Sequence, residues 1–82
     1  MSSTTPLRVE IALDLETSGL DVYGEDEIIE IGAHEASSSF EVLVKPSKPI
    51  CATVAQLTGI TNEMLDEKGI ALEEALAQLI QW

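Results

Sequence analysis

The chain has 82 residues, of which 45% are hydrophobic, so it can bury a core and form one small domain. Four Lys and Arg stand against fifteen Asp and Glu, which gives a formal charge of −11 at pH 7. Proteins that hold long nucleic-acid tracks carry basic stripes, and this sequence has none. A role on nucleic acid would therefore need bound cations, contact with a few nucleotides, or a basic partner. The plainer interpretation of the charge is an acidic surface that keeps a small domain soluble.

The ends and the single cysteine predict an intracellular, cytoplasmic protein. Residues 1–6 form a polar, uncharged leader without the features of a signal peptide, and we expect it to be disordered. No stretch approaches the roughly 20 apolar residues of a membrane span, so no membrane contact is expected. Cys51 stands alone, which excludes an internal disulfide and fits a reducing compartment. The domain itself is expected over residues 7–82.

Three strands are predicted in the first half of the chain. Residues 8–16 alternate between apolar and polar side chains, a period of two that indicates a strand with one apolar face. A polar loop follows, and residues 27–34, which are rich in isoleucine, predict the second strand. Residues 40–45 alternate again and predict the third. The short polar turn at 36–39 makes the second and third strands an antiparallel hairpin.

Helices are predicted in the second half. The prolines within 46–49 end the sheet, since proline cannot donate to a strand ladder. Apolar residues at helical spacing predict a helix over about 50–58, ended by Gly59. A short turn over 61–65 follows, and a second helix with an apolar face runs from 72 to the last residue without a capping glycine. The order predicts an α+β fold in which the apolar face of the first strand packs against the helices.

Asp14 and Glu16 are the most specific chemical feature. Residues two apart on a strand share one face and lie roughly 6.5–7 Å apart, so their carboxylates repel each other unless a cation lies between them. Carboxylate oxygens are ligands that Mg²⁺ and Mn²⁺ prefer. From the spacing alone, a solvated strand edge is the commoner explanation of such a pair.

Three blocks carry a resemblance to a known family. The stretches ALDLETSGL (12–20), DEIIEIGA (26–33) and QLTGITNEML (56–65) resemble, in this order, the first motif and the following segments of the DEDD exonuclease superfamily, which includes ribonuclease T and the proofreading subunit of bacterial replicative polymerase. FEVLVKPSKP (40–49) resembles the third strand of that family and its proline-bearing exit. The resemblance covers nearly the whole chain from about Val9 to Trp82.

The resemblance implies the first half of a ribonuclease-H-like fold and a 3′-to-5′ exonuclease that hydrolyses phosphodiesters with two Mg²⁺ or Mn²⁺ ions. It implies a single-stranded 3′ end of DNA or RNA as substrate. Asp14 and Glu16 would bind the metals and act in catalysis. The residues implied in substrate binding are Thr17, Ser18, Gly19, Leu57, Thr58, Gly59 and Ile60.

The later motifs of the family are missing from these residues. A complete site needs two further aspartates and a histidine or tyrosine as general base, and no Asn-x-x-x-Phe-Asp pattern occurs. His34, the only histidine, lies before the region where the base belongs and is expected to be an ordinary strand residue. Glu30 is likewise expected on the polar face of its strand. We therefore expect a truncated domain whose isolated activity is low.

Two further hypotheses remain open. The chain is either an exonuclease that needs a complementing chain or a second copy, or a catalytically inactive interaction module that keeps the first half of the fold. An open sheet edge and an unfinished helix at Trp82 favour self-association in either case. A mimic of nucleic acid, suggested by the charge, is disfavoured because the acids do not form one continuous run.

Overall fold

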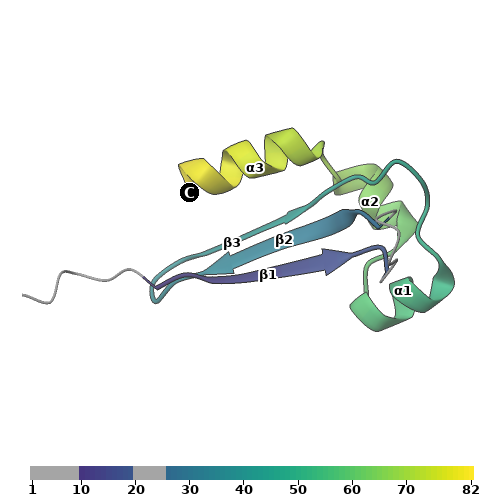
Figure 1. The fold of residues 1–82 in the computed structure, drawn as a ribbon, viewed down its shortest axis with the longest axis horizontal. Helices are drawn as coiled ribbons and strands as arrows, with labels where there is room; N and C mark the ends of the chain where they lie inside the picture. The colour runs from purple at the N-terminus through teal and green to yellow at the C-terminus, as the bar shows by residue number, and fades with distance from the viewer. Residues whose placement is uncertain (1–9, 20–25) are drawn as a thin grey trace, which may run out of the picture.

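The structure is a computed structural model that describes residues 10–19 and 26–82. Three strands precede three helices along the chain (Figure 1). The elements are β1 (Ala12–Thr17), β2 (Ile28–His34), β3 (Ser39–Leu43), α1 (Ala52–Thr58), α2 (Asn62–Lys68) and α3 (Leu72–Gln81). The predicted leader at 1–6 and most of the loop after β1 lie outside the described residues.

The strands form one antiparallel sheet in the order β1-β2-β3, which confirms the predicted α+β class. Asp14 lies opposite Gly32, and Glu16 lies opposite Glu30. The register then slips by one residue, so that Thr17 lies opposite Ile28. Such a slip bends and twists the end of a strand, and it occurs here where β1 gives way to the turn that carries the candidate site.

The helices differ from the prediction in number, because the expected turn at 61–65 is a seven-residue helix, α2. Thr61 caps it by accepting a hydrogen bond from the backbone N–H of Met64 (3.1 Å), and Glu63 and Lys68 lie at the ends that suit their charges. Gly59 ends α1 in a left-handed conformation with φ 77°, which confirms the helix end predicted at this glycine. No helix in the described part of the chain is long and apolar enough to cross a membrane.

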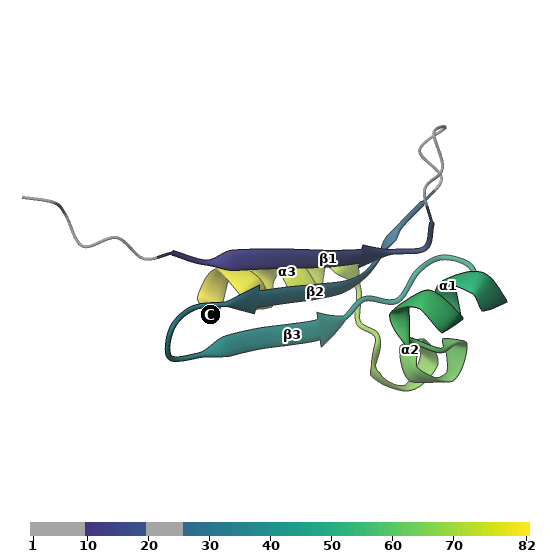
Figure 2. The same ribbon diagram turned by 90° about the horizontal axis from the view of Figure 1, so that it is seen from below.

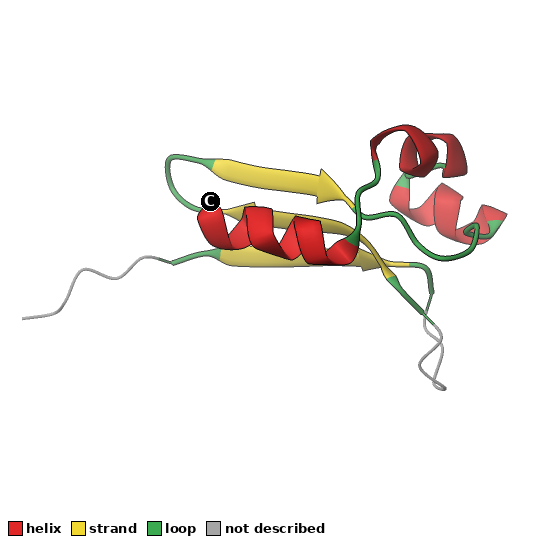
Figure 3. Cartoon of the chain, turned by 90° about the horizontal axis from the view of Figure 1, so that it is seen from above, coloured by secondary structure: helices red, strands yellow, loops and turns green. Residues whose placement is uncertain are grey.

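The core consists of two clusters on different parts of the sheet. Helix α3 lies along one face (Figure 3), where Ala75 packs with Ile31 and Val44. Helices α1 and α2 gather at one end of the sheet (Figure 2), where Ile50, Ile60 and Leu65 pack with Ile29. The backbone after β3 joins the two regions, since Val44 forms a parallel bridge with Ile70 just before α3.

Strand β1 is less buried than the sequence predicts. Leu13 and Leu15 lie opposite Ala33 and Ile31, on the face that α3 covers, yet they remain 55% and 48% exposed. Ile11 is 54% exposed. The physical reason is that α3 packs over β2 and β3 instead of β1. The expectation that the apolar face of β1 is buried by the helices is therefore wrong for the described residues.

Candidate functional site

Strand β1 presents Asp14 and Glu16 on the sheet face opposite α3. Cross-strand partners point to the same side of a sheet, and α3 packs on Ile31, whose partner is Leu15. The alternate residues Asp14 and Glu16 must therefore project from the other face, which no described helix runs along (Figure 2). Asp14 is exposed and Glu16 is half-buried. The predicted carboxylate pair is thus formed and accessible.

Two more carboxylates share this surface, which we call the acidic face: Asp14, Glu16, Glu30 and Glu41. Glu30 lies opposite Glu16, and Glu41 lies opposite Gly32, the partner of Asp14. Burial, followed by the negative charges of Glu41 and Glu16, raises the pKa of Glu30 above its ordinary value. Repulsion by two neighbouring carboxylates thus adds to the effect of burial at Glu30, and a bound cation would reduce that repulsion.

The donor chemistry of the acidic face suits a hard divalent cation. Magnesium and manganese take oxygen ligands, and two carboxylates on one strand provide them. Within residues 10–19 and 26–82, no three His, Cys, Asp or Glu side chains converge as a metal-binding group. Asp14 and Glu16 therefore fit a metal in kind and supply only part of a coordination set.

The turn after β1 is held by several hydrogen bonds. The hydroxyl of Thr17 donates to the carbonyl of Gly19 (2.9 Å). The backbone N–H of Ser18 donates to the carbonyl of Glu27 (2.8 Å), and the N–H of Glu27 donates to the hydroxyl of Ser18 (2.9 Å). A side chain on Gly19 would press against Asp26, whose carboxylate oxygen lies 3.0 Å from the position of the added carbon. The turn is thus fixed against the start of β2.

Helix α1 lies beside this turn and presents apolar surface to it. Leu57 is 82% exposed, which leaves its side chain accessible for stacking against a base. Thr58 ends the helix by donating its hydroxyl to the carbonyl of Val54 (2.8 Å) and accepting from the N–H of Ile60 (3.1 Å). Ile60 itself is buried in the core with Ile29. Gly59 is exposed and shapes the end of the helix.

A shallow, open pocket lies between the turn and the helix, and we call it the β1–α1 pocket. Its volume is about 220 Å³, and it is lined by Leu15, Glu16, Thr17, Gly19, Val54, Leu57 and Thr58. Of the residues predicted for substrate binding, Thr17, Gly19, Leu57 and Thr58 are brought together here. Ser18 and Ile60 do not line the pocket. Ser18 holds the turn by its hydrogen bonds to Glu27, and Ile60 lies in the core. Glu16 belongs to both the pocket and the acidic face, so a ligand in the pocket would lie beside the carboxylate pair.

Sequence reasoning missed two polar residues that connect distant segments of the chain near this site. Both carboxylate oxygens of Glu27 accept hydrogen bonds from Ser47, and Asn62 both donates to and accepts from the backbone of Ile50. Glu27 lies at the start of a predicted strand and Asn62 in a predicted turn, where polar side chains are ordinary. No local pattern distinguishes them, because their partners are distant in the chain.

Known proteins are similar to this chain over most of its length, including the motif blocks described above. The sequence model of the RNase T family, described as Exonuclease, matches residues 11–82. The PolC-type DNA polymerase III of Thermotoga maritima is 41% identical over 75 residues, a match that covers 85% of this chain and 5% of that protein. The DNA polymerase III subunit epsilon of Pasteurella multocida is 36% identical over 76 residues, covering 80% of this chain and 30% of that protein.

A third similar protein carries an activity in its name. The 3′-5′ exonuclease DinG of Bacillus subtilis is 33% identical over 63 residues, covering 71% of this chain and 7% of that protein. The chain therefore spans only a small part of the length of these relatives.

Proposed function

Because the chain belongs to the RNase T exonuclease family, we propose that it binds divalent metal through Asp14 and Glu16 and removes 3′-terminal nucleotides from single-stranded DNA or RNA. The observation that carries the proposal is the position of Glu16, which joins the acidic face to the β1–α1 pocket. A nucleotide held in that pocket would have its phosphate beside the carboxylate pair.

Each part of the site has a separate chemical task. Asp14 and Glu16 would hold Mg²⁺ or Mn²⁺, which when bound supplies an activated water and charge stabilisation for phosphodiester hydrolysis. The exposed side chain of Leu57 would stack on the terminal base, and Thr17 and Gly19 would line the side toward the sugar. The pocket is smaller than the roughly 300–1,000 Å³ of typical ligand sites, which suits a single terminal nucleotide more than a long track.

The net charge of −11 fits this division of tasks. An acidic surface repels a phosphate backbone, so metal ions must supply the attraction, and few nucleotides need to be held. Two carboxylates bind a divalent ion weakly, and no third His, Cys, Asp or Glu side chain joins them in a metal-binding group within the described residues. We therefore expect strong activity only when further carboxylates and a base join Asp14 and Glu16, from a complementing chain or a second copy.

The test is a titration of manganese into the purified chain while the degradation of a 3′-labelled single strand is followed. Cleavage that depends on manganese and disappears in Asp14→Ala supports the proposal and means that the remaining ligands are supplied, as by a second copy. If cleavage is absent, a segment that carries the later motifs of the family is added in trans, and cleavage should then appear. Cleavage that persists in Asp14→Ala would refute the role of Asp14.

The alternative hypothesis, a catalytically inactive interaction module, predicts the opposite result. In that case neither manganese nor any complementing segment restores cleavage, while the chain still binds a partner. Binding of a nucleoside monophosphate in the presence of Mg²⁺ separates the two, because a module that has lost its site has no reason to retain affinity for it.

A further inference from the structure

We propose that Glu27 is a positioning residue that sets the distance between the two walls of the β1–α1 pocket. This inference rests on the proposed function, since the pocket is taken to hold the terminal nucleotide. Glu27 does not line the pocket. It acts by fastening the turn after β1, which forms one wall, to the loop that leads into α1, which forms the other.

The backbone of Glu27 holds the first wall. Its carbonyl accepts from the N–H of Ser18 (2.8 Å), and its N–H donates to the hydroxyl of Ser18 (2.9 Å). Ser18 lies between Thr17 and Gly19, which both line the pocket. Two hydrogen bonds to one residue fix both the position and the orientation of the turn relative to the start of β2.

The side chain of Glu27 holds the loop before α1. The N–H of Ser47 donates to both carboxylate oxygens (3.0 Å each), and the hydroxyl of Ser47 donates to one of them (2.9 Å). Hydrogen bonds to an ionised acceptor are stronger than those between neutral groups. The residue therefore connects Ser18 and Ser47, which lie far apart in the sequence.

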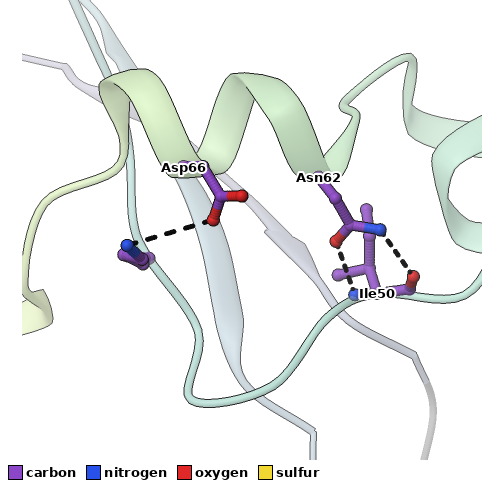
Figure 4. Close-up of polar contacts among 4 residues, drawn as sticks. Ile50, Asn62 and Asp66 are labelled. Carbon is purple, nitrogen blue, oxygen red and sulfur yellow. Dashed lines mark hydrogen bonds and ion pairs between the residues drawn. The ribbon is translucent and has the colours of Figure 1, made fainter.

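The loop passes this constraint on to the second wall. Asn62 accepts from the N–H of Ile50 (2.9 Å) and donates to its carbonyl (3.1 Å), which fastens the end of the loop to α2 (Figure 4). Asp66, which the same figure labels on α2, forms an ion pair with Lys45 (Nζ to Oδ1, 3.9 Å), but both side chains are more than half exposed, so this ion pair contributes little. Val54 of α1 and Leu65 of α2 pack in the same cluster as Ile50, so a loop held at Ser47 also constrains the position of α1.

The substitution Glu27→Gln tests the proposal, because it keeps the shape of the side chain and removes one acceptor and the charge. Glu35→Gln is the matched control: Glu35 also accepts from a serine hydroxyl, that of Ser38 (3.0 Å), in the turn between β2 and β3. The probe is deoxythymidine monophosphate with Mg²⁺, and binding is followed by the amide chemical shifts of Thr17, Gly19 and Leu57.

We expect Glu27→Gln to weaken binding of the nucleotide by up to about 5-fold, since its hydrogen bonds to Ser47 are exposed and solvent screens the charge, while the affinity for Mg²⁺ alone stays unchanged. Glu35→Gln should leave both affinities unchanged. In a form that cleaves, KM should rise with little change in kcat. Glu27→Asp, which keeps the charge and shortens the reach, should weaken binding as much as Glu27→Gln does.

Two results would overturn the inference. The first is unchanged nucleotide affinity in Glu27→Gln, and the second is an equal loss in Glu35→Gln, which would indicate a general effect on stability. A wild-type chain that binds no nucleotide counts against the proposed function. In that event the amide chemical shifts of Leu57 and Thr58 in the free protein still test the role of Glu27. They change in Glu27→Gln if Glu27 positions α1, and they stay the same if it does not.

Discussion

The two faces of the sheet are built from the same three strands and have opposite physical character. On the face covered by α3, Ile31, Val44 and Ala75 are almost fully buried. On the acidic face, all three strands contribute carboxylates, and the pKa of Glu30 is raised by burial and by its neighbours Glu41 and Glu16. Buried apolar side chains on one face stabilise the fold, whereas the other face carries neighbouring carboxylates that repel one another at Glu30.

The difference shows how a small domain separates stability from chemistry. Burying apolar surface is favourable at roughly 25 cal/mol per Å², and β2 collects most of that gain because it is paired on both sides and covered. Strand β1 carries Asp14 and Glu16 at the edge of the sheet, where solvent and ligands have access. A carboxylate pair is tolerated there because the burial that holds the fold together is located elsewhere.

The largest expected effect lies on the covered face. Ile31→Ala should lower the free energy of unfolding by about 2–5 kcal/mol, because it removes a fully buried side chain from the cluster under α3. Leu13→Ala is the matched change on the same face of the neighbouring strand, and because Leu13 is 55% exposed it should cost under about 1.5 kcal/mol. Urea unfolding of both variants measures the contrast. Equal costs would mean that another chain covers β1 in solution.

The next effect concerns the acidic face and metal. At ten times its dissociation constant, Mg²⁺ should stabilise the fold by about 1.4 kcal/mol, which raises the melting temperature by about 6–11 °C. Asp14→Asn should abolish this gain. Glu41→Gln, which neutralises an acid on the same face, should keep it. Equal losses in the two variants would show that the ion is held by diffuse negative charge and not by a site.

The smallest effect is the pH dependence of stability at Glu30. Because its pKa is raised in the folded state, the resulting stabilisation is fully present below the ordinary value of 4.5 and is lost as the pH rises through the folded pKa. Glu30→Gln lacks this dependence, so it should gain stability relative to the wild type over that window.

The gain should stay well below the roughly 4–8 °C in melting temperature that 1 kcal/mol would give, since solvent screens this partly exposed group. Melting curves from pH 4 to 8 measure it, with Glu73→Gln on exposed α3 surface as the control for net charge. A gain of the same size in Glu73→Gln would assign the effect to total charge instead of to the acidic face.

The sequence predicted the strands more reliably than the burial of β1. The alternation in residues 8–16 predicted a strand where the structure has β1, and it placed Asp14 and Glu16 on one face. The same alternation predicted burial for Leu13 and Leu15, which depends on where α3 packs and cannot be read from β1 itself. Where the sequence predicted a turn at 61–65, the structure has the helix α2. Capping by Thr61 and the charges of Glu63 and Lys68 at its ends stabilise the longer helix.

For the candidate site, too, the sequence predicted some features, while others depend on packing. The motif blocks identified the family, which the match over residues 11–82 confirms. They also named Thr17, Gly19, Leu57 and Thr58, which the fold brings together around one pocket. They could not separate Ile60, which is buried in the core, from its exposed neighbours, since burial is a property of packing and not of the motif.

The sequence by itself determined the local features of this protein: the period-two strands, the glycine that ends α1, and two carboxylates on one side of β1. These follow from backbone geometry and from residue types a few positions apart. Only the tertiary structure decided which apolar residues are covered and that Glu27 joins Ser18 to Ser47. Those depend on contacts between residues distant in the chain, whose free energy no local pattern records.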